Sequence, residues 1–136
     1  MYLTYTEYQT MGGTLTENIF TDYEFRAESI INYRTFNRLT KDTSFPVQVK
    51  RLVKHIIDLV DKQSSSLSLG NNDKSSNAYI TSQSNDGVSV SYSGMAATDL
   101  FTLCDKDIQT SINHYLQGVT NSAGRNLLYR GLYANE

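Results

Sequence analysis

The sequence predicts a mainly α-helical fold: a small helical bundle with a β-hairpin insertion between the third and last helices and an extended C-terminal tail. Three long segments repeat apolar residues at helical spacing, and a fourth alternates apolar and polar residues beside a turn motif. Leu, Ile, Val and Phe make up 33 of the 136 residues, about 24%, above the roughly 20% below which chains tend not to fold. At this length we expect one domain, residues 1–136.

The first expected helix is short. Thr4 and Glu7 have the spacing of a capping box, in which the Thr4 hydroxyl accepts from a backbone amide and the Glu7 carboxylate reaches back to the amide of Thr4. The pair Gly12-Gly13 is expected to end this helix, because glycine is favoured just past helix C-termini.

A second, longer helix is expected to run to about Tyr33, with Thr14 or Thr16 as its N-cap. Its apolar residues recur at spacings of one, three and four and share one face: Ile19, Phe20, Tyr23, Ala27, Ile30 and Ile31. The charged residues are expected on the opposite, solvated face: Asp22, Glu24, Arg26 and Glu28. We therefore expect the apolar face to pack against the next helix.

The third helix is expected from Pro46 to about Gln63. Proline suits the first helical turn because its missing N–H would have no partner there. A second apolar stripe follows: Val49, Leu52, Val53, Ile56, Ile57 and Val60. Residues 64–77 contain six Ser and three Asn, which leaves little apolar area to bury, so we expect a flexible loop there.

A β-hairpin is expected after this loop. Residues 78–83 and 88–92 flank Asn85-Asp86-Gly87, and Asp-Gly supplies the positive-φ residues that a tight hairpin turn requires. Val88, Val90 and Tyr92 alternate along one face of the second run and are candidate contact residues. Because an isolated hairpin is marginal in water, we expect it to lean on the helices or on a neighbouring chain.

The last helix is expected to be capped by Thr98-Asp99 and to end at Gly118, with Cys104 as a buried small residue on its apolar stripe. Residues 119–136 then form the tail. An Asn-Ser-Ala-Gly spacer precedes a cluster predicted to dock on a partner: Leu127, Leu128, Tyr129, Arg130, Leu132 and Tyr133. The alternative is that the tail folds back onto its own helices.

Charge is distributed unevenly along the chain, although the formal net charge is only -2. Residues 1–31 hold five acidic residues and one basic residue. Residues 33–54 hold one acidic residue and six basic ones: Arg34, Arg38, Lys41, Lys50, Arg51 and Lys54. These six are candidates for a face that contacts the DNA backbone or the acidic side of a neighbouring subunit, with scattered solvated charges as the alternative.

Residues that carry chemistry are few, so we expect no enzyme and no cofactor. The chain has two His and one Cys, and it lacks a Gly-rich phosphate loop and a nucleophile elbow. His55, Asp58 and Asp61 share one side of the third helix, but we interpret them as an ordinary solvated face, not a metal site. Cys104 and His114 are ten residues apart on one helix, too far for a catalytic pair.

Several motifs resemble, in order along the chain, the head-tail connector (head-completion adaptor) proteins of tailed bacteriophages and prophages. They are the opening Tyr2-Leu3-Thr4-Tyr5-Thr6-Glu7-Tyr8 with Gly12-Gly13-Thr14, the helix start Phe45-Pro46-Val47, the run 85–92, and Leu127-Leu128-Tyr129-Arg130-Gly131. The long Ser/Asn loop departs from that pattern.

The resemblance implies a structural virion protein made in the bacterial cytoplasm and placed at the head-tail interface. Such a protein forms a homo-oligomeric ring beneath the portal, with twelvefold symmetry in the particle. The ring extends the DNA channel, touches packaged DNA without sequence specificity, and gives the next connector or tail component a platform. The sequence shows no signal peptide and no membrane-length apolar run, so we expect no membrane partner.

Two other readings stay open at this point. One is a different structural role in the same particle, as a tail terminator or second-layer adaptor. The other is a small DNA-binding regulator with the helix from Pro46 as its recognition helix, although the eleven-residue connection before it is long for a helix-turn-helix.

Overall fold

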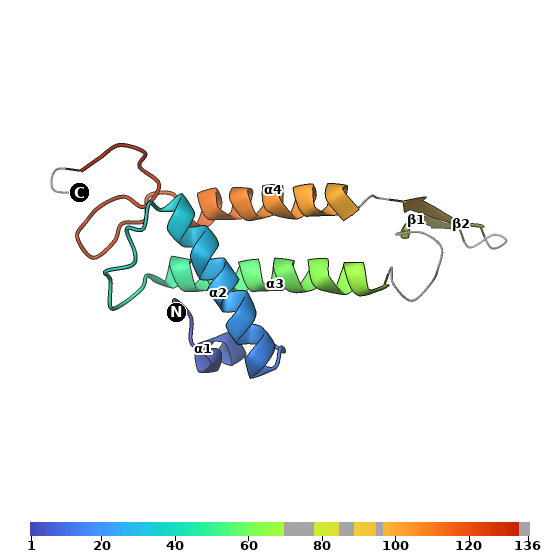
Figure 1. The fold of residues 1–136 in the computed structure, drawn as a ribbon, viewed down its shortest axis with the longest axis horizontal. Coiled ribbons are helices and arrows are strands. Elements are labelled where there is room, and N and C mark those ends of the chain that lie inside the picture. Colours follow the sequence, from blue (N-terminus) through green and yellow to red (C-terminus); the bar gives the residue numbers. More distant parts are fainter. Residues whose placement is uncertain (70–77, 85–88, 95–96, 134–136) are drawn as a thin grey trace. The chain divides into compact units, whose positions relative to one another are not determined.

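The computed structural model describes residues 1–69, 78–84, 89–94 and 97–133. Helices account for most of them, so the predicted mainly helical character is confirmed (Figure 1). The chain divides into two compact units, each described by itself. Unit 1 comprises residues 1–58 and the chain from Ile108 onward, and unit 2 comprises Leu59–Asp107.

Helix α1 spans Tyr5–Thr10, and its predicted capping box is confirmed. The Thr4 hydroxyl accepts from the Glu7 amide at 3.3 Å, and the Glu7 carboxylate accepts from the Thr4 amide at 3.0 Å. Gly12 follows with a φ of 84°, a conformation that favours glycine. A Cβ at Gly13 would overlap the buried Tyr8 ring, so the chain needs glycine to pass this side chain closely.

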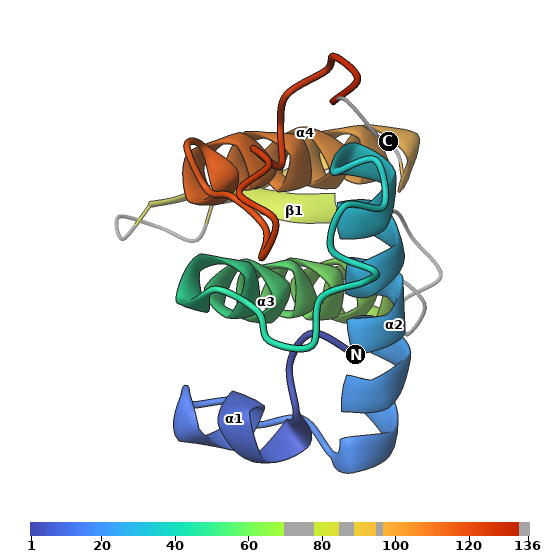
Figure 2. The same cartoon turned by 90° about the vertical axis from the view of Figure 1, so that its left-hand side faces the viewer.

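Helix α2 spans Glu17–Arg34 and begins after Thr16, one of the two predicted N-caps. Within unit 1 it runs across the first part of α3 (Val47–Leu69) and the last part of α4 (Ala97–Leu116), as Figure 2 shows. Phe20, Ala27 and Ile31 are fully buried, whereas Ile19, expected on the same face, is 43% exposed. The core face is therefore narrower than the sequence predicts.

Glu24 corrects the expectation that every charged residue of α2 faces solvent. It is only 3% exposed, and its carboxylate accepts from the amide of Tyr2 at 2.6 Å and from the amide of Leu3 at 3.4 Å. A buried carboxylate needs such donors to offset its lost hydration. The segment before α1 therefore lies on α2 and is held there through Glu24.

Helix α3 carries the predicted apolar stripe, and all six of its stripe residues are fully buried. The helix continues to Leu69, beyond the predicted end at Gln63, so residues 64–69 of the predicted flexible loop are helical. Serine costs only a few tenths of a kcal/mol in a helix, and Gly70 is the first helix-breaking residue after Pro46. Residues 70–77 of that loop lie outside the described residues.

In unit 2, strand β1 (Ala78–Ser84) pairs antiparallel with strand β2 (Ser89–Gly94), with an irregularity in register between Ile80 and Ser82. The predicted turn Asn85-Asp86-Gly87 lies outside the described residues, as does Val88. No side-chain contact is described for Val90 or Tyr92 either. The hairpin with its turn, and its three contact residues, therefore stay predictions.

Helix α4 begins at Ala97, so Thr98 and Asp99 lie in its first turn and do not cap it as expected. An acidic residue is still favourable there, because it faces the positive end of the helix dipole. Cys104 is 8% exposed, which confirms it as a buried small residue, and Gly118 with a φ of 75° follows the end of the helix.

Candidate functional site

Arg38 holds the C-terminal segment against unit 1. Its side chain donates to the backbone oxygen of Asn126 at 3.1 Å and of Gly131 at 2.8 Å, and also to that of Tyr129. The Arg38 guanidinium lies over the Tyr133 ring, 5.0 Å from the ring centre. Arg38 is only 6% exposed, which corrects its assignment to an exposed basic face. Its planar fork suits several carbonyl acceptors at once.

The C-terminal segment is an integral part of unit 1 and not a free docking arm. Leu127 is fully buried, and its amide donates to the Val119 oxygen at 3.0 Å. The predicted Asn-Ser-Ala-Gly spacer forms an ordered turn, because the Asn121 side chain accepts from the amides of Ala123 at 3.1 Å and Arg125 at 2.9 Å. The fold-back alternative therefore holds for Leu127, and the docking prediction is wrong for that residue.

Other predicted docking residues do remain accessible. Leu132 is 87% exposed and Tyr129 is 52% exposed, while Arg130 is also exposed. Leu128 and Tyr133 are half-buried, and the Tyr133 hydroxyl accepts from the Asn126 amide at 2.8 Å. The segment thus buries one side and presents the other.

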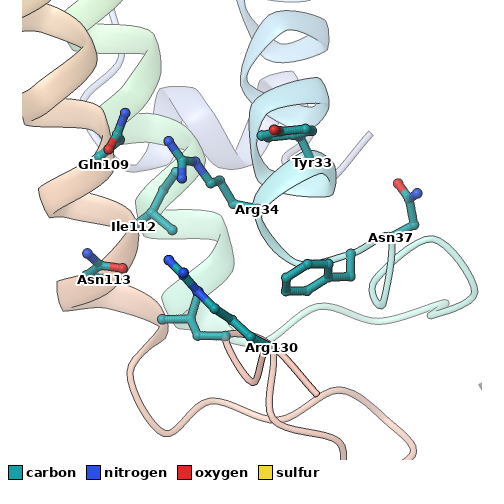
Figure 3. A pocket seen from close by; sticks show the side chains of 9 residues that line it. Tyr33, Arg34, Asn37, Gln109, Ile112, Asn113 and Arg130 are labelled. Carbon is teal, nitrogen blue, oxygen red and sulfur yellow. The ribbon is translucent and has the colours of Figure 1, made fainter. Parts of the chain in front are cut away.

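A pocket of about 690 Å³ opens where the end of α2, the end of α4 and this C-terminal segment meet (Figure 3). Its lining combines two arginines, three side-chain amides and an apolar part: Arg34, Arg130, Asn37, Gln109, Asn113, Tyr33, Phe36, Ile112 and Leu128. Most of these residues are exposed or half-buried, whereas Ile112 is fully buried and forms the floor. It is a partly open hollow, so its polar groups can be reached from solvent.

The pocket is electropositive. Figure 3 shows the side chains of Arg34 and Arg130 extending toward α4, with Ile112 between the two guanidinium groups. Within the described part of the chain, neither guanidinium pairs with a carboxylate. The Arg34 guanidinium lies over the neighbouring Tyr33 ring, 5.9 Å from the ring centre. Paired arginines beside amide groups are suited to binding carboxylates or phosphates.

The backbone beside the pocket is strained. Phe36 has a φ of 55° and Asn37 a φ of 58°, and both residues line the pocket. Asparagine tolerates this left-handed conformation, but phenylalanine does so at a cost of about 1 kcal/mol or more. The Asn37 amide bonds to the Asn32 oxygen at 2.9 Å, and the following Arg38 is fixed by the tail. Such strain is typical of sites that are shaped for contact.

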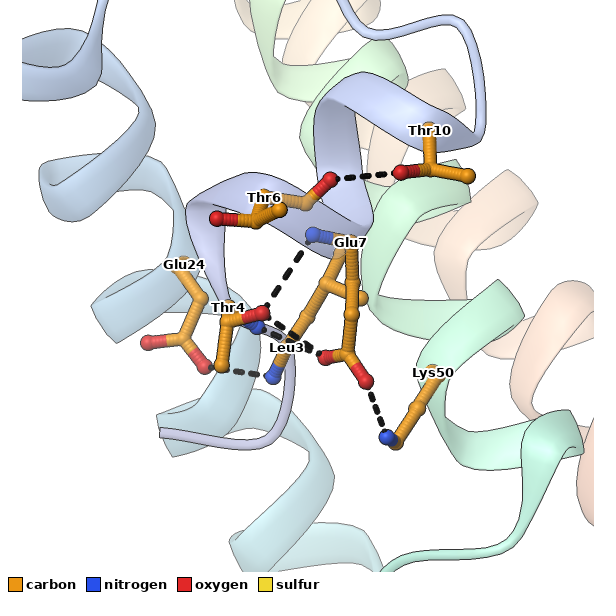
Figure 4. Close-up of polar contacts among 7 residues, drawn as sticks. All are labelled: Leu3, Thr4, Thr6, Glu7, Thr10, Glu24 and Lys50. Carbon is orange, nitrogen blue, oxygen red and sulfur yellow. Dashed lines mark hydrogen bonds and ion pairs between the residues drawn. The ribbon is translucent and has the colours of Figure 1, made fainter.

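The remaining predicted basic residues do not form one face with Arg34. Lys50 pairs with Glu7 (Figure 4), and Lys54 pairs with Asp58 at 2.7 Å. Lys41 and Arg51 are exposed. The basic charges are therefore partly neutralised by acidic neighbours: Asp58 is one helical turn from Lys54, whereas Glu7 is brought to Lys50 by the fold.

Two ionisable groups near the N-terminus have shifted pKa values. Lys50, followed by the amide and hydroxyl of Thr4, stabilises the charged Glu7 carboxylate and lowers its pKa to about 2. Burial raises the pKa of Tyr2 to about 12, and the charge of Glu28 adds to this. The Tyr2 hydroxyl donates to Asn32, and its ring contacts Phe45 with 4.5 Å between ring centres. These groups fasten the N-terminal segment to unit 1.

Large apolar side chains are exposed on the outer side of α2. Phe25 is 71% exposed and Tyr33 is 80% exposed, and Ile19 adds to the same helix. The spacing of Phe25 places it away from the predicted core face. Spacing alone does not predict how much of the Phe25 side chain is exposed to solvent. These side chains are therefore candidates for contact with another protein.

His55 and Asp58, which share one side of α3, each contact another side chain. The His55 ring lies against Tyr115 at 5.8 Å, and Asp58 is paired with Lys54. Among the residues that the structure describes, no three His, Cys, Asp or Glu side chains are grouped to hold a metal ion.

In the same ranges, no helix is both long and apolar enough to span a membrane.

The sequence does not reveal the Arg34–Arg130 pocket. The two residues are far apart in the chain and were assigned to separate features, the basic segment and the tail. They line one pocket because the tail folds back, which the contacts of Arg38 and Leu127 support and no local pattern encodes.

Comparisons with protein-family models, with curated proteins and with solved structures found no match.

Proposed function

We propose that this protein is a structural virion subunit that forms a ring beneath the portal at the head-tail interface of a tailed phage. The ring extends the DNA channel and gives the next connector or tail component its platform, and the role involves no catalysis. The protein is made in the bacterial cytoplasm and joins the particle during assembly. The β-hairpin insertion between α3 and α4 belongs to this proposal as a further contact with a neighbouring chain.

The exposed apolar side of α2 is the observation that carries the proposal. Phe25 and Tyr33 are largely exposed on a helix that already buries its other face, so both side chains are available for contact with a second protein surface. The open pocket, whose two arginines pair with no carboxylate in the described part of the chain, adds a polar contact surface on the same unit. The order of motifs resembles that of the connector family, and this resemblance is the reason for proposing the head-tail interface rather than another assembly.

The proposal is tested by negative-stain imaging and light scattering of the purified full chain, alone and with a portal protein. We expect annular particles at high protein concentration or on the portal. Phe25→Ala should reduce assembly while leaving the melting temperature unchanged. Phe20→Ala, a matched change on the buried face of the same helix, should lower the melting temperature. A chain that stays monomeric both alone and with a portal would overturn the ring.

A tail-terminator or second-layer adaptor would use the same surfaces and differs only in its neighbour in the particle. It is separated by testing which virion component the chain binds. The regulator reading has less support, because Lys50 and Lys54 on the proposed recognition helix are both paired with acidic residues.

A further inference from the structure

The pocket on unit 1 has a chemical complement elsewhere on the same chain. Along α4, Asp99, Leu103 and Asp107 follow one another at intervals of four residues and therefore share one side of the helix. Leu103 is 45% exposed, and both aspartates are exposed. We call these three residues the α4 stripe.

The α4 stripe matches the pocket in order and sign. Its two carboxylates are about 12 Å apart along the helix axis and flank an apolar side chain. In the pocket, two guanidinium groups flank the apolar floor at Ile112. None of these four charged groups has an ion pair within the described residues.

One copy cannot satisfy its own pocket. Leu103 and Ile112 are nine residues apart on one continuous helix, which is about two and a half turns, so they face opposite sides of α4. A rigid helix cannot place its own stripe in a hollow lined by its own last turns. The contact therefore needs a second molecule.

We propose that the Arg34–Arg130 pocket of one molecule binds the α4 stripe of a second copy of the chain, with the carboxylates on the arginines and Leu103 toward Ile112. The contact joins two different surfaces, so each molecule has one pocket and one stripe to offer. Repetition of such a contact closes into a ring or continues as an open filament. The ring outcome rests on the proposed function, whereas the contact itself does not.

Two one-sided variants test this contact in the full chain. Arg34→Ala/Arg130→Ala removes the charges of the pocket, and Asp99→Asn/Asp107→Asn removes those of the stripe. Each should raise the concentration needed for self-association, measured by sedimentation velocity, at least about ten-fold. Circular dichroism melting should show that both variants stay folded.

Matched controls have the same charge at other places. Asp105→Asn changes an exposed acid two residues from Leu103, on nearly the opposite side of α4, and Arg51→Ala changes an exposed base outside the pocket. Both should associate like the unchanged chain. Equal losses from these controls would mean that overall charge, and not the pocket, drives association.

Mixing the two one-sided variants gives the decisive result. The stripe variant keeps a working pocket and the pocket variant keeps a working stripe, so the mixture should form heterodimers and nothing larger. A mixture that stays monomeric, a pocket variant that assembles like the unchanged chain, or an unchanged chain that does not self-associate would each overturn the proposal. Open filaments of the unchanged chain would support the pocket–stripe contact and contradict the ring. Rings formed by the pocket variant would support the ring and contradict the pocket–stripe contact.

Discussion

At the scale of single residues, Arg38 does the most to shape the candidate site. It satisfies three backbone oxygens of a segment about 90 residues away and is nearly inaccessible to solvent. Together with the burial of Leu127, it holds the segment that carries Arg130 on the same unit as Arg34. The pocket therefore depends in part on a buried cation that the sequence alone places on an exposed basic face.

We expect Arg38→Ala to lower the free energy of unfolding by about 3 kcal/mol, because three partly buried carbonyl oxygens lose a charged donor. Arg38→Lys should restore little, since an ammonium lacks the planar fork. Urea denaturation measures both. Lys41→Ala, the removal of an exposed cation, is the control and should change the value by less than about 0.5 kcal/mol. A similar small effect for Arg38→Ala would show that the tail is held by other contacts.

Phe36 offers a separate test of strain beside the pocket. Phe36→Gly relieves a left-handed backbone but loses the contact in which Arg38 lies 5.1 Å from the centre of the Phe36 ring. The two effects are of similar size, so the free energy of unfolding should change by less than about 1 kcal/mol. Loss of a well-packed phenyl ring normally costs about 3–5 kcal/mol. A loss of that size, in denaturation experiments, would mean that the ring supports the core.

Glu7 should make stability depend on acidic pH. Its pKa is lowered from 4.5 to about 2, so its contribution is complete above about pH 4.5 and disappears as the pH falls toward 2. Glu7→Gln keeps a capping-box residue but removes the charge, and should therefore flatten the pH dependence of stability in this window. Thermal melts from pH 5 to pH 2 measure the difference. Because Glu7 is partly exposed, about 0.5 M salt should reduce it, and an unchanged pH profile in the variant would contradict the assignment.

At the scale of elements, the sequence predicts what depends on local periodicity. The α3 stripe is buried at every predicted position, and the Thr4–Glu7 capping box forms as its spacing indicates. The sequence wrongly predicts Glu24 on the solvated face, because the amides that bind its carboxylate belong to residues 2 and 3, more than 20 residues away. It wrongly predicts Leu127 in a docking tail, because the contacts of Arg38 with this segment join residues about 90 positions apart. The Arg34–Arg130 pocket was missed for the same reason.

Two leucines of the C-terminal segment test its new interpretation. Leu127→Ala removes a fully buried side chain and should cost about 2–5 kcal/mol of unfolding free energy. Leu132→Ala is the matched control, because Leu132 is 87% exposed and should cost less than about 0.5 kcal/mol. Chemical denaturation compares them. If both substitutions change the unfolding free energy only slightly, Leu127 is again a candidate for docking on a partner. If Leu132→Ala lowers the unfolding free energy strongly, Leu132 also belongs to the core.

At the scale of the whole molecule, charge limits what a single subunit can do with DNA. The chain has a net charge of -2, Arg38 is buried, and Lys50 and Lys54 are engaged by acidic residues. Of the six residues of the predicted basic face, Arg34, Lys41 and Arg51 are the ones left to contact DNA phosphates. Any useful contact with DNA would therefore come from many subunits acting together, each contributing little.

We expect the isolated chain to bind duplex DNA at or weaker than the usual non-specific range, with a Kd of about 10⁻⁴ M at physiological salt and no preference for sequence. If Arg34, Lys41 and Arg51 are the residues that contact phosphates, the slope of log K against log salt should be shallow, near -3. Fluorescence anisotropy with two unrelated duplexes at several salt concentrations measures affinity, slope and selectivity together. Arg51→Ala should reduce the slope by about one, whereas Lys54→Ala should change it less because Lys54 is already paired with Asp58. Tight, sequence-selective binding that survives about 200 mM salt would instead favour the regulator over the connector, because a channel wall must let DNA slide past.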